Sequence, residues 1–172
     1  MSNILITGSN GQLGRSFKFC SSEYQKFNFV YKDFFQLNIC DENQLRDFLE
    51  KEKISFLINC AAYTNVDAAE EEIEKAQKIN TNAVEILTHL SLEYQFKLIH
   101  FSTDYVFDGI SKRSIKESDM KNPLNFYGIT KHLGEEEVLK NCKKFFIFRV
   151  CWVYGKYGNN FPTKIIKFLN EN

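Results

Sequence analysis

The 172-residue sequence predicts an α/β fold, a doubly wound, Rossmann-like parallel sheet with helices on both faces. Three observations lead to this prediction. Short apolar segments alternate with longer amphipathic ones along the chain. A glycine-rich segment, GSNGQLG at residues 8–14, directly follows the first apolar segment. Small or polar residues follow several other apolar segments, and the carboxyl ends of parallel strands are where such sheets bind ligands.

The composition is that of a single soluble domain. Lysine plus arginine and aspartate plus glutamate each number 22, and the pI is near 6.8, which argues against a nucleic-acid partner. No apolar stretch reaches membrane-spanning length, and no signal segment precedes the first strand. We therefore expect one cytoplasmic domain over residues 1–172. The five cysteines form no Cys-x-x-Cys pair, which favours free thiols over disulfides or a metal site.

The first predicted strand, residues 3–7, leads into glycines at positions 8, 11 and 14 and then into a helix from Arg15 to Cys20. Glycine lets backbone N–H groups approach a pyrophosphate closely, and a helix N-terminus favours an anion. A glycine turn between a strand and a helix therefore indicates a dinucleotide site.

The second predicted strand, residues 26–31, ends beside Lys32 and Asp33. A dinucleotide site needs a group for the adenosine ribose at this strand end. Asp33 suits the 2′-hydroxyl of NADH, and Lys32 suits the 2′-phosphate of NADPH. The residues leave the choice between the two cofactors open.

The middle of the chain continues the alternation. A helix with a capping-box-like start follows Asp41, and residues 54–60 form a buried strand that ends in small residues up to position 64. The acidic run at 67–74 is expected to be the solvated face of a helix, and no metal is expected there. A long helix then runs to about Tyr94. Polar residues 80–82 interrupt its apolar pattern and either contact a cofactor or face solvent.

The stretch that carries the chemistry lies between residues 96 and 131. A predicted strand at 96–101 ends at Ser102, Thr103 and Asp104. After a polar loop, Asn125 is expected to cap a helix that extends to residue 140, which places Tyr127 and Lys131 one turn apart on one face. A hydroxyl, a phenol and an ammonium group at a sheet edge are acid–base groups.

The chain closes with a strand at 144–150, a loop at 155–160 and a helix that begins at Pro162. Histidines 89, 100 and 132 are assigned no role, since a lone histidine beside an apolar strand is usually packed in the interior.

These residues carry a resemblance to the extended short-chain dehydrogenases/reductases, through TGSNGQLG at 7–14, the Thr103 hydroxyl and YGITK at 127–131. Within that family the chain is similar to the dTDP-4-dehydrorhamnose reductases. The motifs that carry this similarity are NCAAYTNVDAAE at 59–70, FSTDYVFDG at 101–109, PLNFYGITKHLGE at 123–135 and RVCWVYGKYGNNF at 149–161.

The resemblance implies reduction of the 4-keto group of a nucleotide-linked 6-deoxyhexose by NADPH or NADH. Tyr127 would protonate the ketone oxygen, Lys131 would lower the pKa of Tyr127, and Thr103 would donate a hydrogen bond to the developing charge. The implied cofactor contacts are Gly8, Asn10, Gly11, Gln12, Leu13, Gly14, Lys32, Asp33, Asn38, Ile39, Ala61, Ala62, Tyr63, Tyr127 and Lys131. The implied substrate contacts are Thr103, Asp104, Trp152, Asn160 and Phe161.

Two departures from the family limit the resemblance. Arg15, Ser16 and Phe17 stand where relatives often carry a glutamate of a metal-linked dimer, so neither that metal nor that dimer is expected, while another homodimer stays open. The family also continues beyond residue 172 with a part that closes over the substrate. We therefore expect the chain to be an N-terminal portion with weak or absent turnover by itself.

Two alternatives to the reductase remain. A nucleotide-sugar epimerase or dehydratase shares this fold, but a dehydratase would be expected to carry a glutamate after Asp104, where Tyr105 stands. A non-catalytic cofactor-binding subunit is the second alternative, and the intact Thr103, Tyr127 and Lys131 set argues against it.

Overall fold

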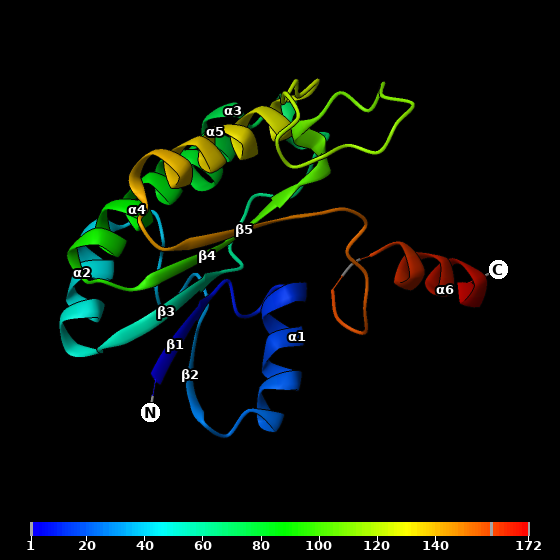
Figure 1. The fold of residues 1–172 in the computed structure, drawn as a ribbon. Helices are drawn as coiled ribbons and strands as arrows, with labels where there is room; N and C mark the ends of the chain where they lie inside the picture. Colours follow the sequence, from blue (N-terminus) through cyan, green and yellow to red (C-terminus); the bar gives the residue numbers. More distant parts are fainter. Residues whose placement is uncertain (1, 159, 172) are drawn as a thin grey trace.

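A computed structural model describes residues 2–158 and 160–171; Met1, Asn159 of the predicted loop and Asn172 lie outside the described residues. The described chain forms one parallel sheet with the strand order β2-β1-β3-β4-β5 (Figure 1). The strands are β1 (Ser2–Thr7), β2 (Phe27–Lys32), β3 (Ile54–Asn59), β4 (Lys97–Thr103) and β5 (Phe145–Val150). The predicted α/β fold with a parallel sheet is confirmed.

Helices connect the strands. They are α1 (Gln12–Cys20), α2 (Glu42–Lys51), α3 (Ile73–Gln77), α4 (Ala83–Glu93), α5 (Phe126–Asn141) and α6 (Phe161–Glu171). A π-helical turn, Lys78–Asn82, joins α3 to α4. The predicted start of the first helix at Arg15 is wrong, since α1 begins at Gln12 with Gly11 as its N-cap. The third glycine of the motif therefore lies inside the helix.

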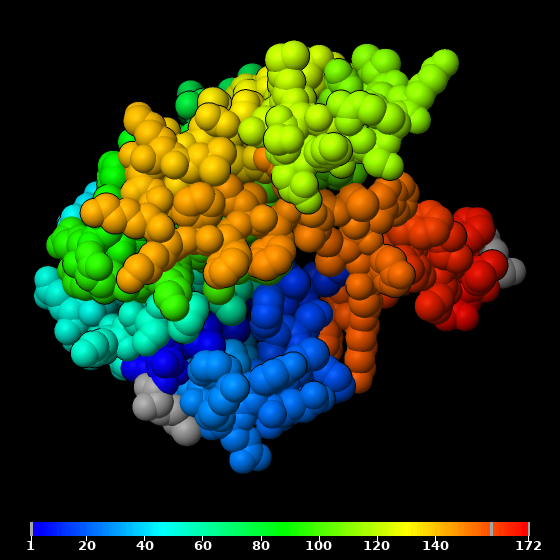
Figure 2. All heavy atoms as spheres, viewed as in Figure 1, coloured from blue at the N-terminus to red at the C-terminus, as the bar shows by residue number. Residues whose placement is uncertain are grey.

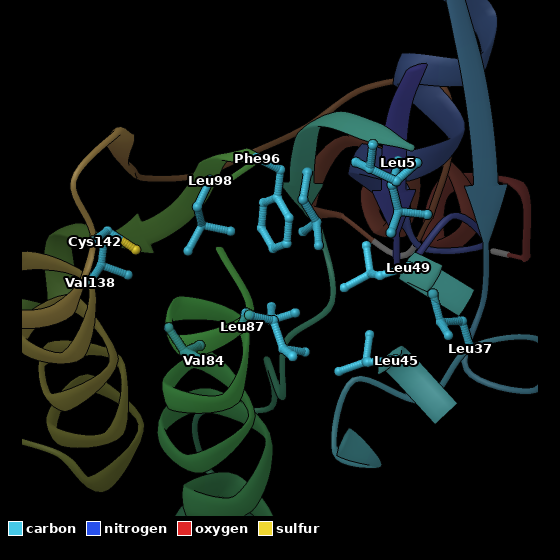
Figure 3. Close-up of a cluster of buried hydrophobic side chains, with 13 residues drawn as sticks. Leu5, Leu37, Leu45, Leu49, Val84, Leu87, Phe96, Leu98, Val138 and Cys142 are labelled. Atoms are coloured by element: carbon cyan, nitrogen blue, oxygen red, sulfur yellow. The ribbon is translucent and has the colours of Figure 1, made fainter. Parts of the chain in front are cut away.

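The apolar core occupies the face of the sheet covered by α2, α4 and α5 (Figures 1 and 3). Leu5, Leu57 and Leu98 of adjacent strands point into it and are fully buried. Their neighbours Ile4, Ile6, Ile58 and Ile99 belong to a second cluster, which includes Phe17 of α1. This alternation is the period of two that a strand imposes on its side chains. Helices therefore cover both faces of the sheet, with α1 on the second (Figure 1).

The second face of the sheet is only partly covered. Phe146 and Phe148 of β5 are 57% and 48% exposed on it. Helix α6 contributes no buried residue among Phe161–Glu171, and it projects from one side of the molecule (Figure 2). Within the described residues, no helix has the length and apolar character needed to cross a bilayer.

The chain crosses the sheet in one direction from β1 to β2 and in the opposite direction from β1 to β3, β4 and β5, because β2 and β3 flank β1. In open parallel sheets, ligands bind outside the carboxyl ends of the strands at such a switch point. The ends of β1 and β3 are Thr7 and Asn59, which pair directly in the sheet. The fold thus places the glycine-rich segment and the segment after β3 side by side.

Candidate active site

The glycine-rich segment fits closely against the end of β3. Gly8 has a φ of +63°, and a Cβ atom there would lie 2.6 Å from the Ala61 nitrogen. A Cβ atom on Gly14 would lie 2.5 Å from the Ser9 Cα atom. Any side chain at either position would collide with backbone, so the sequence must have glycine there. The turn that results opens α1 with free backbone amides, which fits the cradle that a pyrophosphate requires.

Two adjoining cavities lie along the carboxyl edge of the sheet. The first, of about 310 Å³, runs from the glycine turn toward the loop after β2. The second, of about 450 Å³, runs from the glycine turn to the ends of β4 and β5. Gly11, Cys60 and Ala62 line both cavities, so the two cavities adjoin along one edge of the sheet.

Most of the predicted cofactor residues line these cavities. Those in the first cavity are Gly8, Asn10, Gly11, Asp33, Asn38, Ile39, Ala61 and Ala62. Those in the second are Gly11, Gln12, Leu13, Ala62, Tyr127 and Lys131. Gly14 is buried inside α1 and supports the turn from behind.

The two candidates for the ribose lie differently. The Asp33 carboxylate accepts hydrogen bonds from the Asn10 side chain and from the backbone amides of Phe35 and Gln36, and it lines the first cavity. Lys32 does not line it, because its ammonium lies 5.4 Å from the centre of the Phe48 ring on α2. The structure therefore brings Asp33, but not Lys32, to the edge of the cavity.

Tyr63 is also not brought to either cavity. Its hydroxyl donates to Glu72 over 2.8 Å, and its backbone N–H and carbonyl are both bonded to the Asn80 side chain, over 2.9 and 3.0 Å. Asn80 belongs to the π-helical turn and also donates to Thr130 of α5 over 3.1 Å. Asn80 neither faces solvent nor lines a cavity; it ties the segment after β3 to α5.

The three predicted catalytic residues meet in the second cavity. Thr103, Tyr127 and Lys131 all line it, although they come from β4 and α5. Asn125 caps α5 as predicted, because its side-chain oxygen accepts from the Gly128 N–H over 2.7 Å. Glu70 adds a second acceptor for this helix end, at 2.8 Å from the Phe126 nitrogen.

The geometry of Thr103 combines two functions. Its hydroxyl donates to Asp104 over 3.0 Å and accepts from the Tyr105 N–H over 3.2 Å. Thr103 therefore caps the short 3-10 turn Asp104–Val106 and also lines the cavity.

The electrostatics of Tyr127 differ from the expectation. Burial raises the pKa of Tyr127, the Thr103 hydroxyl lowers it, and Asp104 and Tyr105 raise it further, so the pKa lies above its usual value. The predicted lowering by Lys131 is not seen in this structure, because the Lys131 ammonium donates to the Phe101 carbonyl oxygen over 2.6 Å. Tyr127 consequently holds its proton at neutral pH.

Lys131 is 2% exposed, and burial lowers its pKa to about 8 while Glu135 opposes this effect. His100 lies against it, with Nε2 3.5 Å from the Lys131 Nζ atom. The sequence pattern alone indicates no role for His100. Its polar ring in an otherwise apolar strand is the feature that could have indicated a role, since a buried polar group requires a partner.

The predicted substrate residues are only partly assembled. Asp104 and Trp152 line the second cavity with Thr103. Asn160 does not line it: its amide donates to Gln12 and to the carbonyl oxygens of Gly155 and Tyr157, which closes its own loop. Phe161 packs edge-on against Trp152, with ring centres 5.5 Å apart, but does not itself line the second cavity.

Comparison with known proteins agrees with this geometry. The family model described as RmlD substrate binding domain matches residues 1–172. The dTDP-4-dehydrorhamnose reductase of Aggregatibacter actinomycetemcomitans is 36% identical over 171 residues, which cover 99% of this chain and 58% of that protein. A crystal structure of dTDP-4-dehydrorhamnose reductase from Bacillus anthracis in complex with NADP superposes with a TM-score of 0.96 at 35% identity, covering 100% of this chain and 61% of that one.

A more distant structure shows the same fold. UDP-glucose 4-epimerase from Brucella ovis in complex with NAD superposes with a TM-score of 0.75 at 21% identity, covering 87% of this chain and 51% of that one. Structural homologues thus bind NADP or NAD. The chain spans less than two thirds of the length of these proteins. With a family model matched along its whole length, the chain belongs to the RmlD substrate binding domain family and is homologous to the dTDP-4-dehydrorhamnose reductases.

Proposed function

We propose that the chain carries the cofactor site and the acid–base residues of an NADPH- or NADH-dependent reductase. The proposed reaction reduces the 4-keto group of dTDP-4-dehydro-6-deoxy-L-mannose to give dTDP-L-rhamnose, a sugar donor for cell-surface polysaccharide. The observation that carries this proposal is the meeting of Thr103, Tyr127 and Lys131 in a cavity that continues from the glycine turn. We also propose residues 1–172 as the cofactor-binding domain of this enzyme.

The residues of the edge fit a nicotinamide dinucleotide. Gly8 and Gly14 leave no room for side chains where the pyrophosphate would approach, and Asp33 offers acceptors for a ribose hydroxyl in the first cavity. The second cavity would hold the nicotinamide beside Tyr127. When bound, the reduced nicotinamide supplies the hydride that adds to the ketone carbon.

The residues of the chain would handle the proton. Because its pKa is raised, Tyr127 is in the phenol form, which is the form that can protonate the ketone oxygen as charge develops on it. The Thr103 hydroxyl would donate a hydrogen bond to the same oxygen after turning from Asp104. The Lys131 ammonium would stabilise the phenolate that Tyr127 becomes once it has given up its proton. Asp104 and Trp152, at the mouth of the cavity, would contact the sugar nucleotide.

The test mixes the protein with NADPH or NADH and dTDP-4-dehydro-6-deoxy-L-mannose and follows the nicotinamide absorbance. Oxidation of the cofactor in proportion to sugar reduced is the expected result. Isomerised sugar without net oxidation would instead indicate an epimerase, and cofactor binding without any change in the sugar would indicate a non-catalytic subunit. Cofactor binding is measured separately by nicotinamide fluorescence, so that a weak turnover of the 172-residue chain is not mistaken for a missing cofactor site.

A further inference from the structure

A row of buried polar side chains leads from β1 to Lys131. Thr7 Oγ1 donates to Asn59 Oδ1 over 2.8 Å, Asn59 Nδ2 lies 3.4 Å from His100 Nδ1, and His100 Nε2 lies 3.5 Å from Lys131 Nζ. Their exposed fractions are 0%, 1%, 1% and 2% along the row. Because these groups are almost fully buried, their donors and acceptors have to match one another.

The orientation of the Asn59 amide follows from its other partner. Its side-chain oxygen accepts a second hydrogen bond from the Ala61 N–H over 3.2 Å. A backbone N–H group only donates, so the oxygen must face it, and the amide nitrogen must face His100.

The orientation of Asn59 then selects the tautomer of His100. An amide nitrogen only donates, so His100 Nδ1 has to accept, and a neutral ring must carry its proton on Nε2. The ring is neutral because burial, together with the nearby charge of Lys131, lowers the pKa of His100 well below its usual value. The Nε2–H group therefore points toward Lys131 Nζ.

This contact changes character with the charge on Lys131. An ammonium group has three donors and no acceptor. When Lys131 is charged, its N–H groups therefore face the Nε2–H donor of His100, and no hydrogen bond can form between them. A neutral amine has a lone pair and accepts the Nε2–H hydrogen bond. The Phe101 carbonyl oxygen, 2.6 Å from Nζ, accepts from Lys131 in either form.

We propose that His100, held by Asn59 as the Nε2–H tautomer, is a positioning residue that disfavours the charged form of Lys131. Lys131 then takes up and releases a proton near neutral pH instead of being a permanent cation. A role of this proton exchange in catalysis rests on the proposed function, in which Lys131 stabilises the Tyr127 phenolate.

The other groups around Lys131 do not remove this effect. Glu135, one turn further along α5, raises the pKa of Lys131, but burial outweighs it. Tyr127 shares the cavity as a neutral phenol. The Cys60 thiol, which lines the cavity from the end of β3, is also neutral, because burial raises its pKa to about 12.

The first test needs no variant and no turnover. Long-range 1H–15N correlation spectra of the 172-residue protein report which ring nitrogen of each histidine carries the proton. The expected result is that His100 is protonated on Nε2 only at neutral pH. An Nδ1–H tautomer or a doubly protonated ring would overturn the proposal.

The second test measures the titration of Lys131 directly, by NMR of protein labelled at lysine Cε, with Lys131→Arg to assign the signal. In the unsubstituted protein the midpoint is expected well below those of the surface lysines. In His100→Gln the amide oxygen can turn toward Nζ and accept from the ammonium, which should raise the midpoint by about one pH unit, a tenfold change in proton affinity.

The matched control is His89→Gln, which makes the same change at an exposed position on α4 and should leave the Lys131 midpoint in place. An unchanged Lys131 titration midpoint in a folded His100→Gln protein would refute the proposal. If that variant does not fold, the His100 tautomer measured in the first test decides between the two outcomes. Absent sugar reduction with both NMR results as expected would instead count against the proposed function.

Discussion

Tyr127 illustrates how position decides the chemistry of a single side chain. Half-buried beside Thr103 and Asp104, it has a pKa raised by burial, so it carries a proton that it can give up only when a neighbouring oxygen becomes strongly basic. The same tyrosine on an exposed helix face would be an ordinary polar residue. The difference comes from burial and from the end of β4, where Thr103 supplies the hydroxyl and the following turn supplies the Asp104 carboxylate.

Replacing Tyr127 with phenylalanine removes the proposed proton donor and keeps the ring. Sugar reduction should fall by about 100-fold or more, because a positioned general acid typically contributes this much. The dissociation constant of NADPH or NADH should change little, since the ring still lines the cavity. Single-turnover absorbance measurements and fluorescence titration check the two expectations. Tyr154→Phe, at a residue 72% exposed, is the control, and a Tyr127→Phe protein with full activity would contradict the assignment.

Asp33 is the second residue whose position bears on the chemistry, because we expect it to influence the choice between NADPH and NADH. Asp33 lines the first cavity, whereas Lys32 lies over Phe48, so a 2′-phosphate would meet a carboxylate. We expect Asp33→Asn to shift the ratio of NADPH to NADH dissociation constants about tenfold in favour of NADPH, because a like-charge repulsion is lost. Fluorescence titration with each cofactor measures the ratio. Asp47→Asn, on the exposed side of α2, is the control. An equal change in the ratio of dissociation constants there would show that the change in Asp33→Asn does not come from the cofactor cavity.

At the scale of elements, α5 is the structure that holds the site together. Asn125 and Glu70 bond its first turn, and further along the helix Glu135 bonds Arg149 of β5 through two contacts of 2.8 and 2.7 Å. The Glu135 side chain is fully buried and that of Arg149 is 18% exposed. Tyr127 and Lys131 lie between these attachments, so their positions depend on them.

Glu135→Gln should test the second attachment. Removing one partner of a buried ion pair costs about 3 kcal/mol, because the remaining charge stays buried. Burial raises the pKa of Glu135, but the Arg149 guanidinium lowers it, so that the pKa lies below the ordinary value of a glutamate. The carboxylate therefore stabilises the fold above the pKa of the unfolded chain, and this contribution disappears as the pH falls through the lower, folded pKa.

Urea denaturation at neutral and acidic pH measures this effect. The difference in unfolding free energy between the two proteins should be largest at neutral pH and should shrink in acid. Glu136→Gln changes the next residue, whose carboxylate is exposed and 4.0 Å from Lys121, and it should cost less than about 1 kcal/mol. A loss in Glu135→Gln that does not depend on pH would mean that packing, not charge, is responsible.

At the scale of the whole molecule, the parallel sheet brings the ends of β1, β3 and β4 to one edge and buries Lys131 behind them. That arrangement has a cost in stability. Burial lowers the pKa of Lys131 to about 8 in the folded protein, well below that of a free lysine, so the unfolded chain binds its proton more tightly. At neutral pH the buried lysine therefore lowers the free energy of unfolding. This penalty shrinks as the pH rises from the pKa of Lys131 in the folded protein to its pKa in the unfolded chain.

Lys131→Met should remove this pH dependence. The unfolding free energy of the unsubstituted protein, relative to the variant, should rise by about 3 kcal/mol between neutral pH and the pKa of free lysine, at about 1.4 kcal/mol for each unit of pKa shift. Denaturation curves across this range give the difference, in which the titration of other groups cancels. Lys140→Met, at an exposed position of α5, should show no such slope. A flat difference for Lys131→Met would mean that the lysine is not buried in its charged form.

Much of this architecture could be predicted, because it depends on local patterns. The alternation of Leu5 with Ile4 and Ile6 predicts a strand buried on both faces, and Asn125 predicts a helix start. The start of α1 was predicted wrongly, since a glycine inside a helix looks like a helix terminator when its packing against Ser9 is not known. Lys32 was a candidate because it ends a predicted strand, and Tyr63 and Asn160 were implied by the family resemblance, but the side chains of all three make other contacts.

The sequence by itself determined the fold class, the glycine turn and the one-turn spacing of Tyr127 and Lys131, because these depend on spacing along one strand or helix. Only the tertiary structure decided the partners of those groups. His100 and Lys131 are 31 residues apart, and Asn59 and His100 are 41 apart. Contacts of this kind form only when β3 and β4 pair in the sheet and α5 packs beside them, and no local pattern records which buried donor will face which acceptor. The direction of each pKa shift depends on those contacts and on burial, and for that reason it became visible only in the folded molecule.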